Sequence, residues 1–320
     1  MRIGVGRSIR SALGIAILTL LLTVGVADST PPQGARLAVI KITWKPERGR
    51  LLTVNPDGSD PVRLARGPDD GRLSLFSFGP LSWRPDGAEV AFTGVTTFFL
   101  AKADGGGARA INAASAHWPV FAPDGHTVAF TREGERGAAI WTIDLTTWEQ
   151  RQLTPWRRGL VYEATSFSPD GSTLLGTRLD NRRSGVAEPV ALHLESGRVT
   201  RLLPDGLQPI YSPDGSEIAL FRKVGKPKRN ELFVLDVESG AQRRLTRTRY
   251  GYELFASWDP SGERIAFARF RGRHFGWANS IVQINADGTC ETQVLKRRRT
   301  VFYGPAWQPG PGREAGPIDC

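Results

Sequence analysis

The sequence predicts an all-β protein, a six-bladed β-propeller, and three observations point to that fold. A motif of an aromatic residue, one spacer and proline, followed within two residues by a turn glycine, recurs six times. Its prolines step by 38, 46, 44, 47 and 49 residues, a period that indicates a repeat architecture. Each repeat has room for four short strands, which is the content of one propeller blade. The copies occupy residues 83–87, 121–125, 167–171, 211–215, 258–262 and 307–310.

The motif marks the turn of a hairpin within each repeat. Four copies continue as Pro-Asp-Gly, where proline fixes φ and glycine accepts a positive φ, so a tight turn is expected. An apolar run such as residues 128–130 follows, which completes a hairpin. A third strand comes next, as at residues 139–144, and the fourth is expected to end in Leu-Thr, as at residues 153–154 and 245–246.

The two ends of the chain are expected to complete one blade between them. Residues 305–307 read as a first strand without successors, whereas residues 37–40, 51–54 and 62–64 read as strands two to four. One C-terminal strand joined to three N-terminal strands would close the ring and remove two free sheet edges. Residues 44–46 (Trp-Lys-Pro) mimic the motif, so a seven-bladed ring is the alternative.

With these repeats the chain resembles the TolB-like six-bladed β-propellers. Their repeat reads aromatic-Ser-Pro-Asp-Gly, an apolar strand, a strand ending in Asp-Gly, and Leu-Thr; residues 55–58 and 285–288 match the Asp-Gly step. The likeness covers about residues 37–310 and implies the fold more than a function, because the motif residues are scaffold. TolB carries an α/β domain before its propeller, and only about nine residues are expected to separate the leader from the first strand in this sequence. The trans-envelope role of TolB is therefore not implied.

Residues 1–27 have the pattern of a signal peptide. Three arginines precede an apolar stretch at residues 12–26, which is too short for a comfortable bilayer span, and small residues lead to an expected cut after Ala27. An uncleaved N-terminal anchor is the alternative. Residues 28–36 are then a short linker, residues 37–310 the propeller and residues 311–320 a Pro/Gly-rich tail. No membrane span is expected in the mature chain, and its expected location is extracytoplasmic, secreted or periplasmic.

The chain has two cysteines, Cys290 and Cys320. Two cysteines in an exported chain favour a disulfide, which would pin the tail to the ring; two free thiols are the alternative.

Positive charge is concentrated in the loops expected at one end of the ring. The net charge is +10, and removing the three arginines of the leader leaves +7. Aspartates of the Asp-Gly turns are expected at the opposite end, so the molecule should be dipolar. Solvated loop charge is the plain alternative to a binding role. The basic loops are residues 45–50, 157–158, 178–183, 222–229, 247–249, 271–273 and 296–299.

Arginine beside aromatic residues suits the recognition of phosphate, carboxylate or sugar. We therefore expect a non-catalytic module, monomeric, that binds an envelope or extracellular protein or an anionic polymer. A glycan lyase or hydrolase with its site in the channel is the alternative. No catalytic set, metal site or cofactor motif is readable, and export argues against nucleic acid. The candidate ligand-binding residues are Trp156, Arg157, Arg158, Tyr250, Tyr252, Arg271, Arg273, His274, Trp277, Arg297, Arg298 and Arg299.

Overall fold

The computed structural model describes eleven stretches of the chain, and in them every regular element is a strand. The expected leader, residues 1–27, and most of the linker lie outside them, as does the first half of the tail, residues 311–315. The described stretches are residues 34–44, 47–66, 79–94, 96–135, 137–182, 186–226, 229–249, 251–271, 279–297, 300–310 and 316–320.

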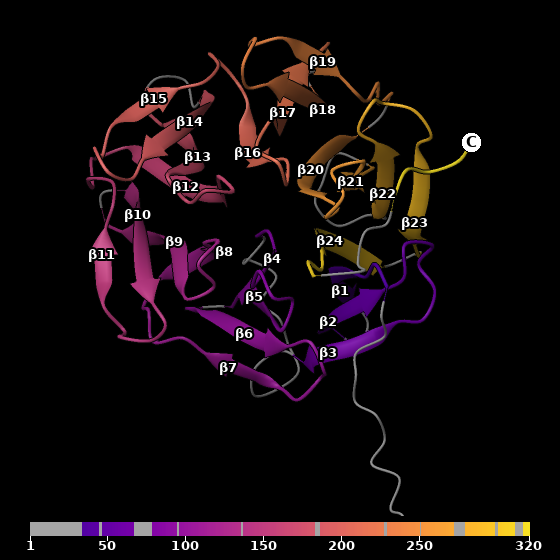
Figure 1. Ribbon diagram of the computed structural model, residues 1–320, viewed down its shortest axis with the longest axis horizontal. Coiled ribbons are helices and arrows are strands. Elements are labelled where there is room, and N and C mark those ends of the chain that lie inside the picture. The colour runs from indigo at the N-terminus through magenta and orange to yellow at the C-terminus, as the bar shows by residue number, and fades with distance from the viewer. Residues whose placement is uncertain are drawn as a thin grey trace, which may run out of the picture. The chain divides into compact units, whose positions relative to one another are not determined.

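The described strands form antiparallel groups of four, which we call blades 1 to 6 (Figure 1). Blade 1 consists of β24 (Thr300–Trp307), β1 (Leu37–Trp44), β2 (Glu47–Val54) and β3 (Val62–Arg66). Blade 2 consists of β4 (Ser82–Trp83), β5 (Glu89–Thr93), β6 (Phe98–Lys102) and β7 (Ala108–Ala110). Blade 3 consists of β8 (Ala116–Phe121), β9 (Thr127–Gly134), β10 (Gly137–Asp144) and β11 (Gln150–Gln152).

The other three blades repeat this order. Blade 4 consists of β12 (Leu160–Phe167), β13 (Thr173–Asp180), β14 (Ala187–His193) and β15 (Val199–Arg201). Blade 5 consists of β16 (Leu207–Tyr211), β17 (Glu217–Val224), β18 (Arg229–Asp236) and β19 (Gln242–Arg244). Blade 6 consists of β20 (Tyr252–Trp258), β21 (Arg264–Phe270), β22 (Asn279–Asn285) and β23 (Thr292–Lys296).

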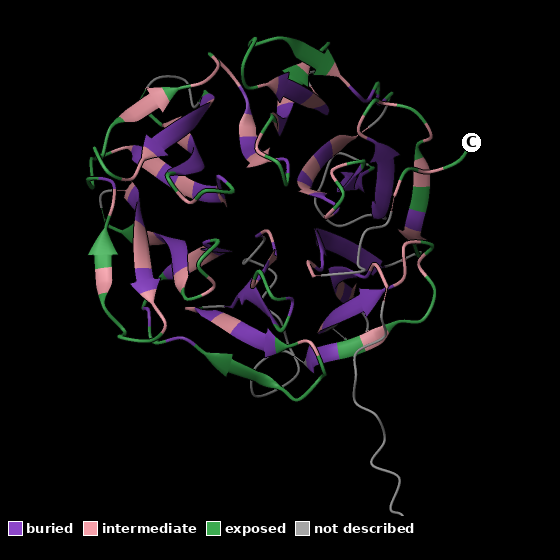
Figure 2. Ribbon diagram, in the orientation of Figure 1, coloured by how far each residue is buried: buried purple, intermediate pink, exposed green. Residues whose placement is uncertain are grey.

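The blades surround a common centre, with the first strand of each blade innermost (Figure 1). Each of the innermost strands, β24, β4, β8, β12, β16 and β20, contacts the innermost strands of both neighbouring blades. Blades 3 and 4 are also joined by a short parallel pairing of β10 with β12, which makes one eight-stranded sheet of the two. Burial is greatest in second strands such as β5 and β21, mixed in innermost strands such as β16, and least in outermost strands such as β7 (Figure 2).

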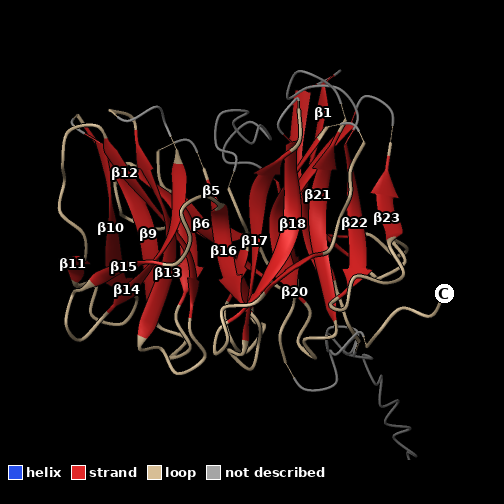
Figure 3. Ribbon diagram, turned by 90° about the horizontal axis from the view of Figure 1, so that it is seen from above, coloured by secondary structure: helices blue, strands red, loops and turns tan. Residues whose placement is uncertain are grey.

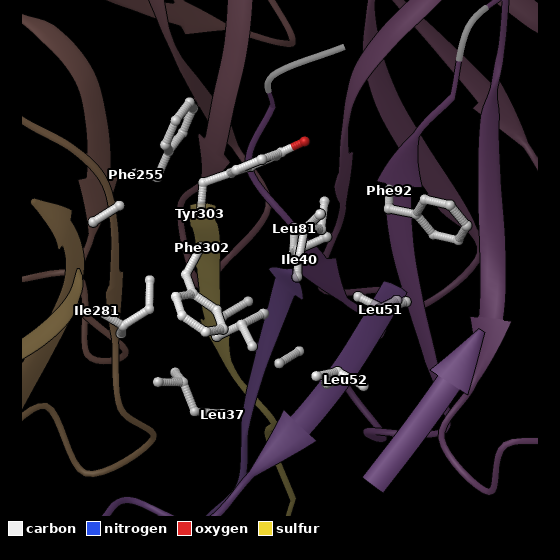
Figure 4. Close-up of a cluster of buried hydrophobic side chains, with 14 of the residues drawn as sticks. Leu37, Ile40, Leu51, Leu52, Leu81, Phe92, Phe255, Ile281, Phe302 and Tyr303 are labelled. Carbon is white, nitrogen blue, oxygen red and sulfur yellow. The ribbon is translucent and has the colours of Figure 1, made fainter. Parts of the chain in front are cut away.

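Blade 1 is assembled from both ends of the chain, as the sequence predicts. β24 pairs antiparallel with β1, from Leu37 opposite Trp307 to Thr43 opposite Thr300. The aromatic-Lys-Pro sequence that suggested a seventh blade begins at the end of β1, where Trp44 pairs with Glu47 across a hairpin. Leu37, Ile40, Leu51, Phe302 and Tyr303 form a buried cluster around the junction (Figure 4).

The repeated motif performs two tasks, of which the turn is the first. In blade 5, Gly215 donates its N–H to the carbonyl of Ser212 at 3.0 Å and has a φ of +78°, which only glycine adopts at little cost. The second task is packing: a Cβ on Gly215 would lie 3.1 Å from Cδ of Pro169 in blade 4. The glycine of one turn therefore lies directly against the proline of the preceding blade.

The Leu-Thr step has a defined role, although the sequence placed it differently. Thr154 and Thr246 lie just beyond β11 and β19, not within them. Their hydroxyl oxygens accept the backbone N–H groups of Ile140 and Leu232 at 2.9 Å in both cases. The step thus extends the pairing of the outermost strand by one side-chain hydrogen bond.

The end of the tail lies on blade 6. Arg264 donates to the carbonyls of Gly316 and Pro317, at 2.8 and 3.1 Å. Asn285 exchanges two hydrogen bonds with the backbone of Ile318, at 2.7 and 3.0 Å. Cys290 and Cys320 are placed as a disulfide-capable pair, with Cα atoms 5.4 Å apart.

Removal of β24 should prevent blade 1 from closing. A chain that stops after Arg299 loses β24, leaves the edge of β1 unpaired and uncovers the cluster around Ile40, so we expect an insoluble or molten product. A chain that stops after Gly310 keeps β24 and is the matched control, expected to be soluble. Solubility and cooperativity of thermal melting check this; a cooperatively melting Arg299 truncation would contradict it.

The cysteine pair should be bonded in oxidised protein and should stabilise it. The cysteines are 30 residues apart, and closing such a loop stabilises by about 3 to 4 kcal/mol in the chain-entropy model. We expect mass spectrometry of non-reduced digests to show one linked peptide pair, and Cys290→Ser with Cys320→Ser to lower the melting temperature. Full alkylation of both thiols without reductant would refute the bond.

Candidate functional site

The antiparallel order of each blade places its loops at two opposite ends of the ring (Figure 3). We call the end with the Pro-Asp-Gly and Asp-Gly turns the turn end, and the opposite one, where the chain crosses between blades, the link end. At the turn end the aspartates are engaged locally. Hydrogen bonds from Ser168 and from Ser172 hold the pKa of Asp170 below its usual value, and Ser212 and Ser216 do the same for Asp214. These carboxylates stay charged but serve the turns.

Only half of the sequence-predicted site residues lie in the described part of the chain. Trp156, Arg157, Arg158, Tyr252, Arg271 and Arg297 do, and all six belong to the link end. The structure distributes them over three places and does not gather them into one site. The others, Tyr250, Arg273, His274, Trp277, Arg298 and Arg299, lie outside the described residues.

The first place is beside blade 3, around Trp156. The Trp156 ring lies 5.7 Å from that of Trp141, and the guanidinium of Arg132 lies over Trp141 at 4.3 Å. Trp156 keeps 44% of its surface exposed, and Arg157 and Arg158 beside it are exposed. Trp156 packs on its own blade, so covering the end of that blade explains its position. Only its exposed edge and the two arginines remain available to a ligand.

The second place is a strip of cations on blade 1 and the end of β23. Lys41 of β1 pairs across the hairpin with Arg50 of β2. Burial, together with the nearby charges of Arg297 and Arg50, lowers the pKa of Lys41, so the three cations lie close enough to repel one another. We call Lys41, Arg50 and Arg297 the blade 1 strip. None of the three forms an ion pair with a residue that the structure describes.

The third place is a pocket of about 250 Å³ where the link between β19 and β20 passes the end of β21. Close by, Tyr252 stacks on Phe270 with ring centroids 5.0 Å apart. We call this cavity the arginine pocket. It is lined by Arg247, Thr248, Arg249, Arg269, Arg271 and Glu291.

Sequence reasoning recovered the arginine pocket only in part. The loop holding Arg247 and Arg249 was recognised as basic, but neither residue was chosen, whereas Arg271 was. Arg269, and the acids Glu253 and Glu291 that bind it, were missed because they lie in or beside strands that read as scaffold. The spacing Arg269-x-Arg271 at the end of a strand is the one signal that points to the pocket.

The centre of the turn end forms a separate, wider depression of about 490 Å³. All six motif copies reach it, through the prolines and aromatic residues that begin the turns. The innermost strand of blade 4, β12, carries Glu163, whose pKa burial raises to about 7. Sequence reasoning missed Glu163 because a single acid on an alternating strand carries no distinguishing pattern.

The described residues contain no group of three or more His, Cys, Asp or Glu side chains placed to hold a metal ion. Within the same stretches, no helix has the length and apolarity needed to cross a bilayer.

Four-stranded antiparallel blades around a common centre define a β-propeller. The family model described as the TolB beta propeller domain matches residues 82–310, and the chain belongs to this family. This confirms the resemblance drawn from the repeats. No curated protein matches the chain.

Solved structures show the same fold. TolB from Acinetobacter baumannii is 23% identical, with a TM-score of 0.71 over 86% of this chain and 67% of its own. A putative TolB from Agrobacterium tumefaciens is 17% identical, with a TM-score of 0.61 over 86% of this chain and 99% of its own. An oligogalacturonate lyase in complex with manganese is 15% identical, with a TM-score of 0.50 over 78% of this chain and 70% of its own. At these identities the likeness shows the fold alone.

Glu163 should make stability depend on pH near neutrality. Its folded pKa of about 7 lies above the ordinary value of 4.5, so the protonated form favours folding; this contribution is complete below about pH 4.5 and lost as pH rises through 7. Glu163→Gln should therefore gain stability relative to wild type between pH 5 and 8, by at most about 1.4 kcal/mol per pH unit.

Urea unfolding of both proteins across that range measures the difference. Glu149→Gln, at an exposed position, is the control and should show a nearly constant offset. A Glu163→Gln offset that is equally constant would contradict the prediction.

Proposed function

We propose that the protein is a non-catalytic, exported β-propeller that binds an anionic partner, a protein segment or an anionic polymer, at its link end. The observation that carries the proposal is a set of uncompensated cations. The blade 1 strip, together with Arg247, Arg249 and Arg271 of the arginine pocket, holds six cations that form no ion pair with any described residue. Some exposed arginines elsewhere, such as Arg201 and Arg243, have carboxylate partners among the described residues, and single ones such as Arg151 do not. The six differ because they gather in two clusters at the link end.

This clustering matters because like charges kept together without counter-charges destabilise a folded protein slightly. They also create a local field that attracts an anionic partner and speeds its association. On a rigid scaffold of blades, loops and strand ends are where binding residues usually lie. The plain alternative is that these cations are only solvated, in which case replacing them would not change the binding of any partner.

An extracytoplasmic location is part of the proposal. Two features support it: the signal-peptide pattern of residues 1–27, and the pairing of Cys290 with Cys320. Disulfides persist in oxidising compartments and are rare in the cytosol.

A channel enzyme acting on an acidic glycan is the second candidate. Glu163 favours it, because a carboxyl whose pKa lies near 7 is suited to general acid or base catalysis. The similarity of this chain to an oligogalacturonate lyase shows a shared fold and is not evidence for a shared activity. Turnover of a polyuronate by the purified protein, lost in Glu163→Gln with binding retained, would favour this candidate over the first.

Charge reversal on the blade 1 strip tests the proposed function. Arg50→Glu with Arg297→Glu should lower the salt concentration at which the protein elutes from a heparin column. The two new carboxylates would repel the negative charges of heparin that the arginines attract. The melting temperature should change little, since exposed charges contribute little to stability. Heparin serves as a generic polyanion.

The matched control is Arg151→Glu with Arg198→Glu, which makes the same change in net charge at exposed positions of the turn end. We expect the control to elute close to wild type. Equal losses in both variants would mean that only net charge matters, and no loss in the strip variant would place the binding surface elsewhere.

A further inference from the structure

We propose that the arginine pocket binds a single oxyanion group, a phosphate or a carboxylate, carried by the partner. The inference deepens the proposed function and rests on it, because it names the chemical group that the link end recognises and the residues that hold it.

The walls of the pocket come from two directions. Arg247, Thr248 and Arg249 come from the link that leads out of blade 5, whereas Arg269 and Arg271 come from the end of β21 in blade 6. The residues are separated by about twenty positions in sequence, so the fold and not a simple basic run brings them together.

Arg269 is the buried floor and is fully compensated. It is 8% exposed and pairs with Glu253 at 2.7 Å and with Glu291 at 2.5 Å. Burial alone would lower the pKa of Arg269, but the hydrogen bonds and charges of Glu291 and Glu253 outweigh it and raise that pKa. Arg269 therefore contributes little directly to binding a ligand, and the carboxylate of Glu291 is engaged by Arg269.

Glu253 also fixes the link above it. Its side chain is wholly buried and accepts hydrogen bonds from the hydroxyls of Thr246 and Thr248 in addition to Arg269. Thr248 stands between Arg247 and Arg249, so this buried hydrogen bond anchors the segment from which both arginines extend. A binding wall anchored in this way loses less conformational freedom when a ligand arrives.

The other three arginines are the ones available to a ligand. Arg247, Arg249 and Arg271 are exposed and form no ion pair with a described residue. Three guanidinium groups around one cavity repel one another, and a bound anion removes that repulsion while accepting charge-assisted hydrogen bonds. Guanidinium groups suit carboxylate and phosphate because their paired N–H donors match two oxygens at once.

The size of the pocket limits what can enter. At about 250 Å³ it lies below the range of about 300 to 1,000 Å³ typical of sites that enclose whole small molecules. It fits one charged group of a larger chain, with the rest of the partner lying on the surface outside.

Titration calorimetry with two separate probes, inorganic phosphate and a short galacturonate oligomer, tests the inference and distinguishes the two sources of oxyanion. We expect wild type to bind at least one of them. Arg249→Gln with Arg271→Gln should weaken that binding at least tenfold, whereas Arg249→Lys with Arg271→Lys, which keeps the charge but not the paired donors, should give an intermediate loss. Binding of neither probe by wild type would overturn the inference.

The matched control is Arg151→Gln with Arg198→Gln, which removes two charges from exposed positions of the turn end and leaves the pocket intact. It should weaken probe binding less than threefold; equal losses in the two variants would overturn the pocket as a specific site. Melting curves verify that all variants are folded. If Arg50→Glu with Arg297→Glu releases the protein from heparin but the pocket variants bind the probes unchanged, the proposed function stands and this inference fails. If instead the pocket variants lose probe binding and Arg50→Glu with Arg297→Glu elutes from heparin like wild type, the pocket is supported and the blade 1 strip is rejected as a binding surface.

Discussion

The ring depends on satisfying the backbone of its innermost strands. Each of these strands has one edge within its own blade and one edge that faces the next blade, where no strand runs alongside for its full length. Buried backbone N–H groups must find acceptors. Side chains of neighbouring blades supply them: Ser82 accepts from Phe121 at 2.9 Å, Ser166 from Tyr211 at 3.2 Å and Ser257 from Trp307 at 3.1 Å.

A second row of such bonds lies deeper in the ring. The hydroxyls of Thr93, Thr131 and Thr177 accept from the backbone N–H groups of Trp118, Ala164 and Gln208 in the next blade. The side chain of Gln208 continues the row by accepting from Phe255 at 2.8 Å. Several of these amides lie at β-bulges of the innermost strands, and Trp118, Gln208 and Phe255 have positive φ. The cost of that backbone conformation is offset where the neighbouring blade provides the acceptor.

These contacts explain why the fold could be read from the sequence and the site could not. The turn chemistry of Pro-Asp-Gly is local. The proline rings of the four Pro-Asp-Gly copies also lie against the glycine of the next turn, so one motif reports both the hairpin and the blade spacing. The joining of β24 to β1 followed from counting strands. The arginine pocket depends instead on which side chains meet between a link and the end of β21, and on Glu253 neutralising Arg269. No local pattern encodes that pairing, so Arg271 was found while Arg269 and Glu291 were not.

The construction of blade 1 has a consequence for how the fold can be rearranged. Leu37 and Trp307 face each other in adjacent strands, so the two ends of the propeller lie side by side. The chain could therefore begin and end at another place in the ring while the blades keep their spatial order. A circularly permuted chain, with a short linker joining residues 310 and 34 and new ends placed in an exposed turn such as residues 238–241, would keep every described strand pairing. The pairing pattern therefore does not require that the strand joining the two ends lie in blade 1.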